Sequence, residues 1–168
     1  MNHQRPLFSI HKKPVKQIIM NFNHLIKINQ IQLNKDASSK KKVLETISHI
    51  INENYPELSI NKVFETLLDR ERLGSTGIGH GVALPHGRLT ECTEIIGVFI
   101  SLKEGIDYDT IDKKPVKLLF ALLLPDNVTE EHLQILAKLA EFFRIKENRQ
   151  TLKNATSSES VYNILINI

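Results

Sequence analysis

The residues best suited to chemistry in this chain lie in one glycine-rich segment that leads to a histidine. Residues 72–88 read Arg-Leu-Gly-Ser-Thr-Gly-Ile-Gly-His-Gly-Val-Ala-Leu-Pro-His-Gly-Arg, and five of the chain's seven glycines lie between residues 74 and 87. Glycine permits positive φ and close approach of a ligand, so main-chain amides here can turn toward an anion such as phosphate. The run 82–84 reads as a short buried strand that Pro85 stops, which presents His86 at its end. We therefore take His86 as the candidate chemical centre.

Further donors and flexible positions surround this histidine. Gly87 gives the backbone freedom directly after the ring, so that the side chain can stand at a sharp exit from the strand. Taken alone, a Pro-His-Gly tripeptide is typical of a structural turn. The candidates for a phosphate-binding loop are Gly74, Ser75, Thr76, Gly87 and Arg88, with Arg72 as a further source of positive charge.

A second histidine, His132, supports the interpretation of this segment as a candidate reaction site. Thr129 is typical of the N-cap of a long helix, with two glutamates in the first turn, and His132 then takes the third helical position. The helix dipole favours the neutral ring there. The strand before this helix ends at Pro125, so two parallel strands would bring both imidazoles to one edge of the sheet. The alternative for His132 is a helix-start residue without a role.

Two neutral imidazoles suit the transfer of a phosphoryl group. The lone pair of one ring nitrogen can attack phosphorus and later release the group, and the other ring can hydrogen-bond the phosphoryl oxygens. The spacing of His86 and His132 therefore predicts a phosphoryl-relay site.

Other chemistries fit the sequence less well. The glycine spacing gives neither G-x-G-x-x-G nor G-x-x-x-x-G-K-[ST], so nucleotide binding lacks its motif. His80, His86 and His132 show no HExxH spacing, and we expect no metal and no cofactor. Cys92 is expected to be an inert surface thiol in a polar turn, and the aspartates of the 103–114 loop to form a solvated turn.

Composition indicates an ordinary protein of one domain that works in a reducing compartment. The 168 residues contain one cysteine and carry a net charge of +3. Residues 1–42 hold nine basic residues against one acidic, and the remainder holds 13 against 18. We interpret the basic segment as a solvated tail and a lysine-rich first helical turn, not as a nucleic-acid-binding arm, because no motif accompanies it. No apolar run reaches the roughly 18 residues of a membrane span or forms a signal-peptide core, so we expect a cytoplasmic protein without membrane insertion.

The order of expected elements favours an α/β sandwich with helices on both faces of a small mixed sheet. Residues 1–19 are expected to form a poorly ordered extension, and residues 20–168 a single domain. Ser38 and Ser39 can cap the first helix and Ser59 the second. The last long helix is expected to turn Leu133, Leu136, Ala137, Ala140 and Phe143 inward. The expected helices cover about 40–54, 60–73, 129–144, 147–154 and 158–166, and the strands 82–84, 95–102 and 116–124 together with an edge strand near residue 33.

The segment 70–88, Arg-Glu-Arg-Leu-Gly-Ser-Thr-Gly-Ile-Gly-His-Gly-Val-Ala-Leu-Pro-His-Gly-Arg, resembles the active-site segment of a known family. These are the mannitol/fructose-type enzyme IIA domains of the bacterial phosphoenolpyruvate phosphotransferase system, and the resemblance is closest to their nitrogen-regulatory branch. It covers about residues 22–168 and includes the runs 117–125 and 131–138. It implies a three-layer α/β/α sandwich, transient phosphorylation of His86 on Nε2 by a phosphorylated HPr-like carrier, and assistance by His132. His80 stands where relatives often carry asparagine, which implies that it is not essential.

The resemblance also implies partners. Regulatory members bind targets such as potassium-transport proteins and sensor kinases according to their phosphorylation state. The chain contains no HPr-like, IIB or IIC region, which favours regulation over sugar uptake. Two alternatives remain at this point: a sugar-specific IIA transport component that passes phosphate to a IIB protein, and a binding module whose His86 is never phosphorylated.

Overall fold

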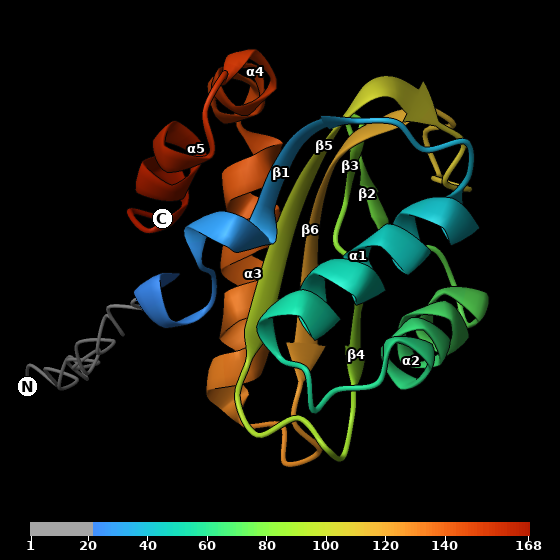
Figure 1. The fold of residues 1–168 in the computed structure, drawn as a ribbon. Coiled ribbons are helices and arrows are strands. Elements are labelled where there is room, and N and C mark those ends of the chain that lie inside the picture. Colours follow the sequence, from blue (N-terminus) through green and yellow to red (C-terminus); the bar gives the residue numbers. More distant parts are fainter. Residues whose placement is uncertain (1–21) are drawn as a thin grey trace, which may run out of the picture.

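A mixed sheet lies between two layers of helices in the computed structural model, which describes residues 22–168 (Figure 1). The predictions made for residues 1–19 lie outside this range. The strands are β1 (Ile31–Lys35), β2 (Gly77–Gly79), β3 (Val82–Ala83), β4 (His86–Arg88), β5 (Ile96–Ile106) and β6 (Val116–Leu124). The helices are α1 (Lys40–Asn54), α2 (Ile60–Arg72), α3 (Glu130–Arg144), α4 (Lys146–Asn154) and α5 (Ser158–Leu165), with two 3-10 turns, η1 (Phe22–His24) and η2 (Ile28–Gln30).

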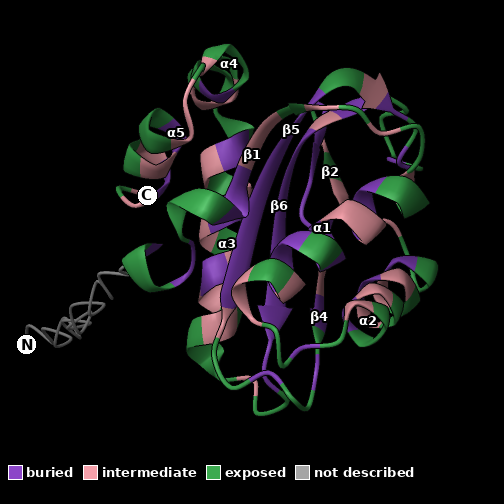
Figure 2. Ribbon diagram, in the orientation of Figure 1, coloured by how far each residue is buried: buried purple, intermediate pink, exposed green. Residues whose placement is uncertain are grey.

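The sheet is mixed because its strands pair both ways. The order is β1-β5-β6-β3-β2, with β4 also beside β6. β1 runs parallel to β5, β5 antiparallel to β6, and both β3 and β4 parallel to β6, whereas β2 pairs with β3 antiparallel. The central pair, β5 and β6, is buried on both faces over most of its length, as its near-continuous apolar sequence predicted (Figure 2).

Alternation along β6 divides the core into two clusters. Leu119, Ala121 and Leu123 face α1 and α2, whereas Leu118, Phe120 and Leu122 face the layer that contains α3 and α5. Figure 1 shows α1 and α2 in front of the sheet and α3 behind it. The predicted three-layer α/β/α sandwich is confirmed.

Local signals fixed the helix starts well. The Ser39 hydroxyl oxygen accepts a hydrogen bond from the Lys42 amide (3.1 Å), and that of Ser59 accepts one from the Lys62 amide (3.4 Å). Each serine satisfies an amide that has no partner inside its helix, so both predicted N-caps are confirmed.

Two predictions of burial were wrong. On α3 the buried side chains are Ile135, Leu139 and Phe143, which are spaced by four, whereas Leu133 is 61% exposed and Ala137 is also exposed. Only Leu133 and Ala137 were placed on the wrong side, because the buried row of α3 runs along Ile135, Leu139 and Phe143, and Phe143 is buried as predicted. Leu136 and Ala140 pack at the edge of the core as predicted.

Cys92 is the second wrong prediction. Its side chain is only 3% exposed and packs in the cluster beneath α1 and α2. The Cys92 amide closes a turn on the Leu89 carbonyl, which points the thiol inward, and Sγ donates to the Glu94 carbonyl at 2.8 Å. Burial raises the pKa of this thiol, so it is inert for a reason other than the expected one.

Candidate functional site

The chain does not turn away at Pro85, as the sequence had suggested, but continues along β6. β3 pairs with β6 up to Ala83, and β4 resumes the pairing where His86 lies opposite Leu122. Between them the Pro85 carbonyl still accepts a hydrogen bond from the Leu122 amide (2.9 Å). Proline lacks only the donor, so it interrupts the ladder without ending the extended path. His86 therefore stands at the start of a strand and not at a strand exit.

Gly87 has a packing role and not the predicted conformational one. It lies inside β4 opposite Leu123, and a Cβ at this position would lie 2.7 Å from Cγ2 of Thr66 and 3.2 Å from the Thr66 carbonyl oxygen. Only a residue without a side chain lets α2 come this close to the strand. The glycine thus holds α2 against the segment that carries His86.

The His86 ring is half-buried and fixed by its own backbone. Its Nδ1 lies 2.7 Å from the Leu84 carbonyl oxygen, which can only accept, so Nδ1 carries the proton and Nε2 carries the lone pair. Burial is the main effect, and it lowers the pKa of the ring. The positive charge of Arg70 lowers the pKa further, whereas the Leu84 carbonyl and the negative charge of Glu71 raise it. The ring is therefore neutral at pH 7, with a nucleophilic nitrogen at Nε2.

His132 has the complementary hydrogen-bonding pattern. Its Nδ1 accepts a hydrogen bond from the Thr129 amide at 3.1 Å, so the proton of the neutral ring is on Nε2, which can donate. Thr129 is the N-cap of α3, as predicted.

Sheet register relates the two histidines. The two rings were predicted to meet if the strand at 82–84 lay parallel to the strand before α3, and β3 is indeed paired parallel with β6, as is β4 after it. His86 pairs with Leu122, whose side chain faces α3, so the ring lies on the α3 face of the sheet. α3 starts six residues after the end of β6, at the same end of the sheet as β4 (Figure 1). His86 and His132 thus share one face and one end of the sheet.

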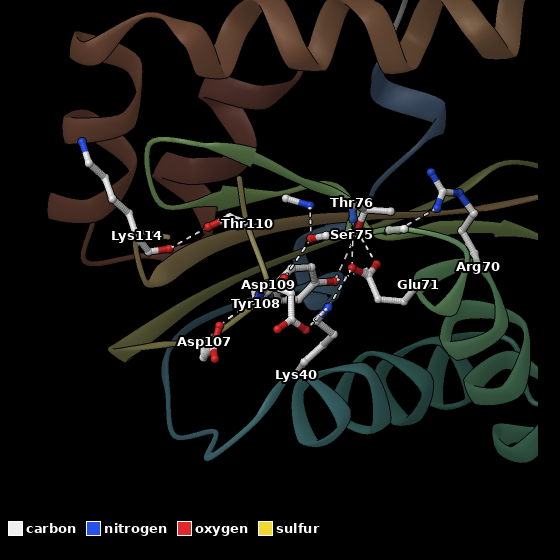
Figure 3. A network of polar contacts seen from close by, with 12 residues as sticks. Lys40, Arg70, Glu71, Ser75, Thr76, Asp107, Tyr108, Asp109, Thr110 and Lys114 are labelled. Carbon is white, nitrogen blue, oxygen red and sulfur yellow. Dashed lines mark hydrogen bonds and ion pairs between the residues drawn. The ribbon is translucent and has the colours of Figure 1, made fainter. Parts of the chain in front are cut away.

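The donors of Ser75 and Thr76 are engaged within the protein. The buried Glu71 carboxylate accepts hydrogen bonds from the amide and the hydroxyl of Thr76, at 2.9 and 2.5 Å. Ser75 Oγ donates to the Tyr108 carbonyl (2.8 Å), and the Lys40 ammonium lies 3.2 Å from Glu71 (Figure 3). Burial, with Glu71 beside it, raises the pKa of Tyr108, which stays protonated. This network fixes the loop after α2.

Arg70 is a further candidate site residue that the sequence analysis did not select. It is close enough to lower the pKa of His86, and its Nη1 donates to the Gly74 carbonyl at 2.9 Å. The spacing contained a signal, since Arg70 follows Thr66 by one helical turn and Thr66 faces β4. The predicted Arg72 instead pairs with Asp69 on the surface (3.0 Å). The predicted Arg88 is exposed at the end of β4.

The remaining candidates lie away from His86. His80 is exposed with a φ of 57°, and its amide donates to Asp112 (2.9 Å), which also accepts from the Thr110 hydroxyl. Asp112 therefore organises its loop and is not merely solvated. Within residues 22–168 there is no group of three or more histidine, cysteine or acidic side chains that could hold a metal ion. Over the same residues, no helix has the length and apolar character needed to cross a membrane.

Comparison with known proteins gives matches over most of the chain. The family model described as "Phosphoenolpyruvate-dependent sugar phosphotransferase system, EIIA 2" matches residues 24–168. The chain is 40% identical over 136 residues to a nitrogen regulatory protein of Pseudomonas aeruginosa, covering 81% of this chain and 88% of the relative. It is 44% identical over 130 residues to a nitrogen regulatory protein of Escherichia coli K12, covering 77% and 79%.

Solved structures show the same fold. The nitrogen regulatory protein IIA-Ntr of Neisseria meningitidis superposes with a TM-score of 0.79 at 43% identity, over 83% of this chain and 94% of that one. The mannitol IIA of Escherichia coli gives a TM-score of 0.69 at 22% identity, over 83% and 98%, which is a likeness of fold alone.

Proposed function

The chain belongs to the EIIA 2 family of the phosphoenolpyruvate-dependent sugar phosphotransferase system, and from this premise we propose that it is a cytoplasmic regulatory phosphocarrier that accepts a phosphoryl group on Nε2 of His86. Membership implies a phosphotransfer role, and the similar nitrogen regulatory proteins favour regulation over the sugar-specific alternative. The observation that carries the proposal is the bond from His86 Nδ1 to the Leu84 carbonyl, because it leaves Nε2 as the nucleophile.

The proposed step is a direct transfer from a phosphorylated HPr-like carrier. The Nε2 lone pair of His86 forms the new N–P bond, while the bond between phosphorus and the donor breaks and its electron pair leaves with the donor. The ring retains its Nδ1 proton and gains positive charge as the bond forms. The Leu84 carbonyl oxygen, 2.7 Å from Nδ1, stabilises that charge where it develops.

His132 and Arg70 are proposed to stabilise the phosphoryl oxygens. The Nε2–H of His132 is a free donor once Nδ1 accepts from the Thr129 amide. Arg70 supplies a fixed positive charge, since its guanidinium is tied to the Gly74 carbonyl. Ser75, Thr76 and Gly74 contribute by fixing the loop through the Glu71 network. Arg88 extends the positive charge at the end of β4.

Regulation follows from the charge that phosphorylation adds, about −1.5 to −2 at neutral pH. The exposed Leu133 follows His132 at the start of α3, so a target that docks over this end of the sheet would meet at least one apolar side chain beside the site. A target that docks there discriminates between the two forms by electrostatics and desolvation. Proteins of potassium transport and sensor kinases are the proposed classes of target.

The proposal is tested by intact-mass analysis after incubation with phosphoenolpyruvate, enzyme I and an HPr-like carrier, kept at alkaline pH. We expect the mass of one phosphoryl group on the wild type, none on His86→Asn, and normal labelling of His80→Asn, a surface histidine in the same segment. Labelling of His86→Asn would refute the assignment. No labelling of the wild type would leave a binding module as the function.

Two further experiments test the finer assignments. His132→Ala should slow transfer by roughly 10²-fold, the effect of losing one preorganised donor, while circular dichroism shows an intact fold. Unchanged kinetics would remove His132 from the mechanism. Rapid transfer onward to a purified IIB domain would favour the sugar-transport alternative over a regulatory role.

A further inference from the structure

A second basic site lies far from His86, in a hollow between α4 and the start of β6. The hollow has a volume of about 360 Å³. One face of α4, at positions spaced by three or four residues, forms a wall, and the loops before β3 and β6 form the other. Its lining residues are His80, Gly81, Lys114, Pro115, Lys146, Arg149, Gln150 and Lys153.

A second hollow, of about 290 Å³, shares the lining residue Lys153 with the first. Lys117 and Lys103 line this second hollow, but Lys103 is paired with Asp36 at 3.4 Å. The shared lysine places one cation where the two hollows meet. Neither lining contains an aspartate or a glutamate.

Over residues 22–168 the cations of the hollow form no ion pair with a carboxylate. Among the described residues, no carboxylate lies within 4 Å of the ammonium groups of Lys114, Lys146 or Lys153. Burial is the main cause that lowers the pKa of Lys153, and the positive charges of Arg149 and Lys117 add to it, because these two cations lie near the lysine. Such crowding of like charge is unfavourable until an anion binds.

Two features preorganise the hollow. Arg149 is held in place because its Nη1 donates to the carbonyls of Phe143 and Arg144, at 2.8 and 2.7 Å. Asp112, beside the rim of the hollow, is turned toward the backbone, where its carboxylate accepts hydrogen bonds from the amides of His80 (2.9 Å) and Lys114 (3.2 Å). The acid therefore holds the rim of the hollow in place, and although its charge acts on Lys114 it forms no ion pair with the lysines of the hollow.

The hollow is distinct from the phosphoryl-transfer site. His86 pairs with Leu122, and Val116, next to Pro115 of the lining, lies six residues earlier on the same strand. At about 3.3 Å per residue this is a separation of roughly 20 Å. A phosphoryl group on His86 cannot reach these lysines.

We propose that this hollow binds a small anion carrying at least two phosphoryl groups, either inorganic or on a metabolite. Several ammonium groups around one fixed guanidinium match the oxygens of adjacent phosphoryl groups. The concave shape and the volume suit a small molecule and not a nucleic-acid duplex. The proposal stands independently of the phosphorylation of His86.

The test is titration of the full, unphosphorylated chain with inorganic pyrophosphate or with a nucleoside diphosphate, followed by amide shifts in NMR. We expect saturable shifts at Gly81, Arg149 and Lys153, with a Kd below about 1 mM. Lys153→Gln should weaken binding by about tenfold, as should Lys146→Gln. Tighter binding of the nucleoside diphosphate would indicate a metabolite, and equal binding an inorganic ligand, both consistent with the site.

Three outcomes would overturn the proposal. The matched control is Lys41→Gln, which removes an exposed lysine of α1, and an equal loss of binding in it would indicate a diffuse charge effect. Amide shifts of equal size with sodium chloride at matched ionic strength would also indicate a diffuse charge effect. Binding of duplex DNA without binding of pyrophosphate would assign the surface to a polyanion instead. Because all three lysines are on the surface, thermal unfolding is expected to change little in each variant.

Discussion

The contact between Gly87 and α2 makes a sharp prediction about what holds the strand of His86. In Gly87→Ala the new Cβ would lie 2.7 Å from Cγ2 of Thr66, whereas ordinary contacts begin at 3.4 Å. Something must move by about 0.7 Å, and the Thr66 carbonyl oxygen at 3.2 Å limits a backbone shift. Overpacking of this kind costs about 1–3 kcal/mol.

A part of that cost is offset in the unfolded state. Replacing glycine by alanine reduces the freedom of the unfolded chain and stabilises by about 0.4–1 kcal/mol where the native φ permits alanine. The net loss in free energy of unfolding should therefore be roughly 1–2 kcal/mol, which corresponds to a fall in Tm of about 2–8 °C for a chain of this size.

The assay is urea unfolding followed by circular dichroism, because the chain contains no tryptophan. The matched second variant is Thr66→Ser, which removes Cγ2 but keeps the hydroxyl that donates to the Lys62 carbonyl (2.7 Å). In the double variant most of the loss should be recovered, with a coupling of about 1 kcal/mol. If Gly87→Ala were as stable as the wild type, or if Thr66→Ser recovered nothing, close approach of α2 would not explain the glycine.

Three further predictions concern buried polar groups. Glu71→Gln places an amide where a carboxylate accepts from Thr76 and faces Lys40, so the free energy of unfolding in urea should fall by about 3–5 kcal/mol. Glu65→Gln, on the exposed face of the same helix, should lower it by less than about 0.5 kcal/mol. Similar losses in both variants would show that the network is dispensable. Burial lowers the pKa of His86 below its ordinary 6.5, so the unfolded chain takes up that proton first. The stability contributed by the neutral ring should be present above pH 6.5 and be lost as the pH falls below it, and the pH profile of His86→Asn should lack this component. Cys92 should react with a thiol reagent roughly 10²-fold more slowly in the native chain than in urea, since only opening of the core exposes it; equal rates would contradict its burial.

Features encoded by adjacent residues were predictable from the sequence. Ser39 and Ser59 indicate where their helices begin, because an N-cap side chain bonds an amide only three residues later in the sequence. The apolar runs of β5 and β6 were recognisable because a strand buried on both faces needs no alternation. β4 was missed because a three-residue strand with glycine at its centre has no local signal, and only its pairing with β6 defines it.

In the candidate site, too, features set by adjacent residues were predictable and features set by distant residues were not. His86 and His132 could be selected from their neighbours, and the parallel strands that relate them were an inference from two prolines. The Glu71 network could not be foreseen, because Tyr108 reaches Glu71 across 37 positions of sequence and Lys40 comes from a different helix. Gly87 was selected for the wrong reason. A glycine needed for its φ freedom and a glycine needed for close packing look the same in a sequence.

The two core clusters can form at different times, because the chain is synthesised from its N-terminus. Every residue of the cluster beneath α1 and α2 lies between Val43 and Leu123, so this half can close while the last helices are still in the ribosome. The other half joins Phe22 near one end to Leu165 near the other, and the hydroxyl of Ser158 donates to the Ile31 carbonyl across 127 positions. The α3 face of the sheet, with the ring of His86 on it, is thus completed only after α5 has been made, later than the face that packs against α1 and α2.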